Sequence, residues 1–130
     1  MASWNELREY VEGKYKIADR TDGMLKLLFG VEGDRSQFVL VARISNDNTG
    51  EEWVGISSPI GSVDSVDLAE AARLAFNVLW GGIVIIGDMV YLHHAAPRVN
   101  LDTNEFERPL SILVGQADEI EKALTGGDNF

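Results

Sequence analysis

The sequence predicts a single-domain α+β protein, residues 1–130, in which helices pack on one five-stranded antiparallel sheet. Two periodicities support this class: apolar residues recur at every second position in five runs and at every third or fourth position in three others. Along the chain these runs follow the order α-β-β-β-α-β-β-α. No repeat, linker or low-complexity segment separates them, which indicates one domain.

The first helix is expected to begin at Ser3. Ser3 and Glu6 have the spacing of a capping box, in which both side chains bind backbone N–H groups that the first turn leaves free. Trp4, Leu7 and Val11 then recur on one helical face, so this face is expected to pack against the sheet.

Three alternating runs follow, and we expect them to form an antiparallel meander. They cover residues 24–31, 37–45 and 52–58, and polar segments separate them. The odd-numbered side chains of the first run are expected to be buried. Pro59 and Gly61 are expected to end the third run.

Trp53 lies on the opposite face of the third run from Val54 and Ile56. A large apolar side chain in this position indicates either a contact surface or a place in the core, and the sequence favours neither. Trp53 is therefore one candidate interface residue.

The segment Asp67–Trp80, DLAEAARLAFNVLW, is predicted to be the helix around which the chain is organised. Asp67 and Glu70 have cap spacing at its start. Two neighbouring apolar stripes run along it, so one is expected to face the sheet and the other a partner. The first stripe is Leu68, Ala71, Ala75, Val78 and Leu79, and the second is Ala69, Ala72, Phe76 and Trp80.

The second stripe predicts a homodimer interface, although it could instead belong to the intramolecular core. Ala69 and Ala72 are small enough to let a second helix approach, while Phe76 and Trp80 would supply buried area. Arg73 would then lie beside the interface and could pair with Glu70 of either chain.

The last third of the chain predicts a hairpin and a long helix. Residues 83–86 and 89–94 are apolar runs joined by Gly87-Asp88, a pair typical of tight hairpin turns. A capping box opens the final helical stripe near residue 102. Pro109 either kinks this helix or marks its start after a short turn.

The amino-acid composition limits the classes of partner that this chain is expected to bind. The net charge is −10, which argues against nucleic acid and anionic membranes, since both are bound mainly through Lys and Arg. The chain has no cysteine, and its first residues lack the basic and apolar regions of a secretory signal, so a cytoplasmic location is expected.

No motif indicates catalysis, a metal or a cofactor. His93 and His94 are adjacent in a predicted strand, where they point to opposite faces and cannot chelate one ion together. Neither a nucleophile elbow nor a glycine-rich phosphate loop occurs. We therefore expect no enzymatic activity, no cofactor and no metal.

Two strings near the C-terminal end resemble the YbjN-type family of bacterial proteins, whose fold is similar to that of type III secretion chaperones. They are IVIIGDMVYLHHAAPR and LDTNEFERPLSILVGQADEIEKAL, the latter with its late Ala117-Asp118 pair. The element order agrees over nearly the whole chain. The resemblance implies a five-stranded antiparallel sheet packed by helices, a dimer through the second helix, and a role in binding proteins without catalysis.

The sequence thus predicts a non-enzymatic, chaperone-like or regulatory protein that dimerises through Asp67–Trp80 and holds a segment of a partner protein. The alternative is an acidic inhibitor or immunity-type protein that blocks a basic partner through charge. A third possibility, a small-molecule site, would need polar groups that converge in a pocket between sheet and helices.

Overall fold

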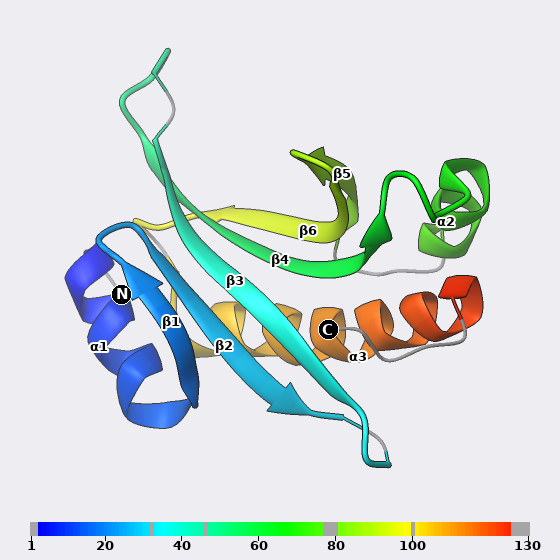
Figure 1. The fold of residues 1–130 in the computed structure, drawn as a ribbon. Coiled ribbons are helices and arrows are strands. Elements are labelled where there is room, and N and C mark those ends of the chain that lie inside the picture. Colours follow the sequence, from blue (N-terminus) through cyan, green and yellow to red (C-terminus); the bar gives the residue numbers. More distant parts are fainter. Residues whose placement is uncertain (1–2, 32, 46, 77–80, 100, 126–130) are drawn as a thin grey trace.

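A computed structural model describes residues 3–31, 33–45, 47–76, 81–99 and 101–125 (Figure 1). These residues form an α+β domain with one six-stranded antiparallel sheet. The elements are α1 (Trp4–Lys14), β1 (Ile17–Thr21), β2 (Met24–Gly30), β3 (Ser36–Ser45), β4 (Glu52–Ser62), α2 (Leu68–Ala75), β5 (Gly82–Ile86), β6 (Met89–Pro97) and α3 (Thr103–Thr125). The strands lie in the order β1-β2-β3-β4-β6-β5.

The prediction of five strands was wrong because it missed β1. This strand has the sequence IADRT, and four of its five side chains are exposed, so no apolar alternation marks it. It pairs with β2 through the register Thr21↔Met24, which leaves Asp22-Gly23 as a two-residue loop. That dipeptide is typical of hairpins and was the available signal.

The third run is longer than expected. β4 continues through Pro59 to Ser62, with a register irregularity between Pro59 and Gly61 where it pairs with β6. Pro59 is tolerated inside the sheet because a bulge locally releases the backbone from the ladder.

The second helix is shorter and less central than the sequence suggested. Asp67 caps it as predicted by accepting a hydrogen bond from the Glu70 N–H, but α2 ends at Ala75 and buries only Ala71. Residues 77–80, which include Trp80, lie outside the described residues.

The helix at the centre of the fold is α3, which packs on β3, β4 and β6. Asp102 accepts a hydrogen bond from the Glu105 N–H at 2.7 Å, so the predicted capping acid is at its N-terminus. Pro109 lies inside one uninterrupted helix, which rules out the alternative of a restart at that residue.

Both α1 and α3 lie on the same side of the sheet, which we call the covered face (Figure 1). The odd-numbered residues of β2 are buried there, as predicted, and Leu25 and Leu27 are fully inaccessible. Glu107 of α3 ties the two helices together by accepting hydrogen bonds from Tyr10, Tyr15 and Lys14. Lys14 and the tyrosines hold the pKa of the Glu107 carboxyl below its usual value.

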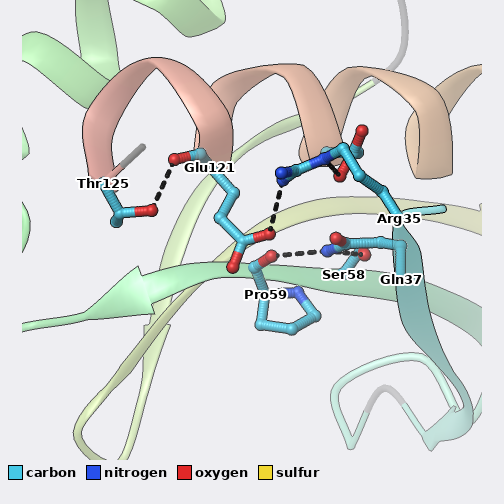
Figure 2. A network of polar contacts seen from close by, with 7 residues as sticks. Arg35, Gln37, Ser58, Pro59, Glu121 and Thr125 are labelled. Atoms are coloured by element: carbon cyan, nitrogen blue, oxygen red, sulfur yellow. Dashed lines mark hydrogen bonds and ion pairs between the residues drawn. The ribbon is translucent and has the colours of Figure 1, made fainter. Parts of the chain in front are cut away.

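A polar network fixes the C-terminal half of α3 on this face (Figure 2). Arg35, just before β3, donates to Asp118 at 2.8 Å and lies 3.4 Å from Glu121, whose side chain is fully buried. Beside it, Gln37 donates to the Ser58 hydroxyl at 2.9 Å and to the Pro59 carbonyl at 2.7 Å. The Arg35 contacts hold α3 against the start of β3, and the Gln37 contacts join β3 to β4.

Candidate functional site

The opposite side of the sheet has no described helix over β3, β4 and β6, and we call it the open face (Figure 1). Residues paired across antiparallel strands point to the same side, so the register defines its members. They are Asp19 and Thr21 of β1; Met24, Lys26, Leu28 and Gly30 of β2; Ser36, Phe38, Leu40, Ala42 and Ile44 of β3; Trp53, Gly55, Ser57 and Pro59 of β4; Gly82, Val84 and Ile86 of β5; and Met89, Tyr91, His93, Ala95 and Pro97 of β6.

This face is apolar, and no described helix lies over it: Ser57 and Tyr91 at its centre are buried among neighbouring side chains, whereas residues on the flanking strands remain accessible. An antiparallel sheet with one solvated face normally alternates apolar and polar residues along each strand. Here the side chains of Leu28, Phe38 and Leu40 are partly exposed, and Ile44 and Ile86 are 37% and 54% exposed. A contiguous apolar surface of this kind is typical of an interaction site.

Charge is nearly absent from the open face. Lys26 is the one charged side chain that strands β2–β6 place there, and its ammonium lies 4.3 Å from the centre of the Phe38 ring. The cation is thereby held over an aromatic face. At the β1 edge, Asp19 pairs with Lys26 in the register and lies on the same side.

Small residues make the floor of the open face along β4. A Cβ on Gly55 would lie 2.6 Å from Ile44 Cδ1 and 3.2 Å from His93 Cε1, so these two side chains close over the glycine backbone. Ser57, the next residue on this side, is 6% exposed.

Ser57 and His93 form the one polar pair recorded between side chains of this face. The Ser57 hydroxyl lies 2.7 Å from His93 Nδ1. Burial lowers the pKa of His93 below its usual 6.5, so the ring is neutral at pH 7. A serine nucleophile needs a base that a third group orients, and the described contacts of His93 contain no such group.

The two edges of the sheet differ. The β1 edge carries Asp19 and Arg20 and a register irregularity after Ile17, which are the usual protections against pairing with another chain. The β5 edge, GIVII, has neither a charge, a proline nor an irregularity, and Ile85 is 51% exposed. An extended segment could therefore add to β5 but not readily to β1.

The predicted interface residues fall in two separate places. Ala69, Ala72 and Arg73 are exposed on α2, and Phe76 at its C-terminal end is 87% exposed, so Phe76 is not part of the intramolecular core. Arg73 donates to Glu70 of its own chain at 3.0 Å. Trp53 lies apart from them, half-buried on the open face.

The described residues hold no group of three or more histidine, aspartate or glutamate side chains suited to a metal ion. No described helix has the length and apolar character needed to span a membrane. A hollow of about 540 Å³ between β6 and the start of α3 is lined partly by His94, Glu105 and Arg108. It opens at the rim of the covered face.

Of the interface residues that the sequence predicts, only Trp53 lies on the open face. The sequence of residues 37–45 also indicates this face. Phe38, Leu40 and Ile44 alternate there with Val39 and Val41, so the strand is apolar on both sides. A strand of that kind needs cover on both sides. The chain matches no protein-family model, and no curated protein matches it.

Proposed function

We propose that this chain is a non-enzymatic, chaperone-like or regulatory protein that holds a segment of a partner protein on the open face of its sheet. The observation that carries the proposal is an apolar face on which strands β2–β6 place one charged side chain, Lys26, beside Asp19 of the edge strand β1, on a domain whose net charge is −10. Strongly charged chains otherwise keep such surfaces small, because exposed apolar area promotes aggregation.

The physical gain on binding is apolar burial. Covering apolar surface stabilises a complex by about 25 cal/mol per Å² before the costs of ordering are subtracted. Leu28, Phe38 and Leu40 are only partly exposed, so they are preorganised by their neighbours and lose little freedom when covered.

The test is suppression of aggregation, followed by light scattering, of reduced α-lactalbumin, an acidic reporter that charge attraction would not bring to this chain. We expect wild type to suppress scattering and Leu40→Glu on the open face to lose that ability. Val99→Glu is the matched control, because Val99 is apolar and 62% exposed but lies outside the open face. Equal suppression by both variants would contradict the proposal.

Self-association through α2 is a separate part of the proposal. Its support is the exposed row Ala69, Ala72 and Phe76. Ala72→Glu would repeat a like charge across a two-fold axis, so it should convert a dimer to a monomer in light scattering coupled to size exclusion, whereas Val99→Glu should not. If the wild-type chain is a monomer at high micromolar concentration, self-association through α2 is contradicted.

The acidic-inhibitor alternative makes a different prediction about salt. Binding that depends on charge weakens steeply as ionic strength rises, whereas apolar burial is nearly indifferent to it. Binding of partners that disappears at high salt and survives Leu40→Glu would favour the inhibitor.

A further inference from the structure

The central strands of the open face, β4 and β6, present no free backbone edge to a further segment. β4 pairs with β3 and β6, and β6 pairs with β4 and β5, so both floor strands have partners on both sides. A segment lying on this face must therefore satisfy its own N–H and C=O groups. A helix does so internally, whereas an extended segment could pair only along the β5 edge.

From this and the charges described next, we infer that the open face receives an amphipathic helix of another protein, with basic residues at one end. The inference rests on the proposed function and names the kind of partner. The open face is about 20 Å long along β4 from Trp53 to Pro59, at about 3.3 Å per residue, and its accessible side chains, such as Leu40 and Ile44, lie on the strands beside β4. A helix that covers it has about 14 residues, or four turns, at about 1.5 Å per residue.

Acidic groups gather at one end of this floor. Asp64 and Asp67 follow β4, and Asp88 is in the turn before β6; all three are exposed. The Val63 N–H donates to the Asp88 carbonyl at 2.8 Å, which holds the two loops side by side. Arg73 is paired with Glu70, so it does not neutralise them.

The other end of the floor is closer to balance. There Arg43 and Arg98 both pair with Glu52 of β4. Asp47 and Glu51 add negative charge in the β3–β4 loop. The asymmetry between the ends favours a helix whose Lys or Arg residues lie beside Asp64 and Asp88.

A second copy of this chain fits the face less well. Its exposed apolar helix surface, the row on α2, begins beside the acidic residues Asp67 and Glu70. Placing that row on the open face would bring like charges together, and each copy carries a net charge of −10.

Three synthetic peptides of about 15 residues, with one apolar stripe in common, test the inference by isothermal titration calorimetry. The first has lysines at one end, the second has glutamates in their place, and the third has the lysines and a central proline. We expect the first to bind wild type at least 10-fold more tightly than either of the others, with the proline acting by breaking the helix.

Protein variants locate the site. Leu40→Glu should abolish binding of the lysine peptide, and Val99→Glu should leave it unchanged. The double change Asp64→Asn with Asp88→Asn should reduce the preference for lysine over glutamate to less than 3-fold while the apolar contribution persists.

Three results would overturn the inference. If the proline peptide binds as tightly as the lysine peptide, strand addition at β5 is indicated. If the glutamate peptide binds as tightly as the lysine peptide, the acidic residues do not select a basic partner. A wild-type dimer that Leu40→Glu dissociates would show that a second copy occupies the face. If these results appear while Leu40→Glu still abolishes suppression of reporter aggregation, the inference fails and the proposed function stands; if suppression survives Leu40→Glu, both fail.

Discussion

The covered and open faces of the sheet are built from the same strands but differ in what surrounds their side chains. On the covered face, Leu27 and Val39 are fully buried under helices, and the Arg35, Asp118 and Glu121 network is closed within the chain. On the open face, their chain neighbours Leu28 and Phe38 are equally apolar but remain partly exposed.

The difference teaches that apolar character alone does not identify the core of this domain. The core is where helices supply a second layer, and the specific polar contacts lie there too (Figure 2). The open face has the composition of a core and lacks the second layer, which is the physical basis for assigning it to a partner.

Leu27 and Leu28 give the sharpest test of this difference, because they are neighbours on β2 and point to opposite faces. Leu27→Ala should lower the free energy of unfolding by about 4 kcal/mol, since it leaves a cavity in a packed core. Leu28→Ala should cost about 1 kcal/mol. Urea denaturation measures both, and equal losses would show that the open face is covered within the monomer.

Arg35 tests whether the covered face depends on its polar network. Arg35→Met removes the cation from Asp118 and Glu121, whose side chains are 8% and 0% exposed, and should cost about 3 kcal/mol. Arg43→Met is the matched surface change, because Arg43 is 48% exposed and Glu52 keeps Arg98. It should cost less than about 1 kcal/mol; similar urea midpoints for the two variants would contradict this account.

The two histidines extend the comparison to pH. Burial lowers the pKa of both His93, on the open face, and His94, on the covered face. Because the unfolded chain takes up these protons first, the free energy of unfolding should fall as pH drops below 6.5. When the lysine peptide covers the open face, NMR titration should show a further fall in the pKa of His93 and little change for His94.

A histidine pair that responds equally to the peptide would contradict the assignment of its binding face. Replacing each histidine in turn by glutamine identifies the two signals and provides the control. Each glutamine variant should lose part of the pH dependence of the unfolding free energy, because each removes one of the two histidines.

Gly55 should show the smallest effect on stability. In Gly55→Ala the new Cβ would meet the end of the Ile44 side chain at 2.6 Å, and this flexible group can move away. Unfolding should change by less than about 1 kcal/mol, while calorimetry should show altered affinity for the lysine peptide. An unchanged affinity would mean that Ile44 and His93 do not contribute to the binding surface.

Much of the fold follows from local sequence signals. Ser3, Asp67 and Asp102 cap helices where the sequence predicts them, and Gly87, with φ +63°, makes the expected turn between β5 and β6. β1 escaped prediction because its stability comes from pairing with β2 and not from its own apolar pattern. The sequence left open whether the last helix continues through Pro109 or restarts there; burial along the helix offsets the local cost of the proline, so it continues.

The candidate site was harder to predict for a physical reason. The sequence shows that strands such as 37–45 are apolar on both faces, but only the placement of α1 and α3 decides which face stays open. Asp67–Trp80 was predicted to be the organising helix because its sequence carries two apolar stripes. Of the described residues of that segment, only Ala71 is buried, and whether its exposed row binds a second copy stays a prediction.

The central claim is that the open face binds a protein segment, and methyl NMR with the lysine peptide tests it most directly. The account predicts shifts in the methyl groups of Leu28, Leu40, Ile44 and Val84, with Leu27, Val39 and Val41 on the covered face unchanged. Shifts confined to α2 or to the covered face, or no shift at saturating peptide, would contradict it.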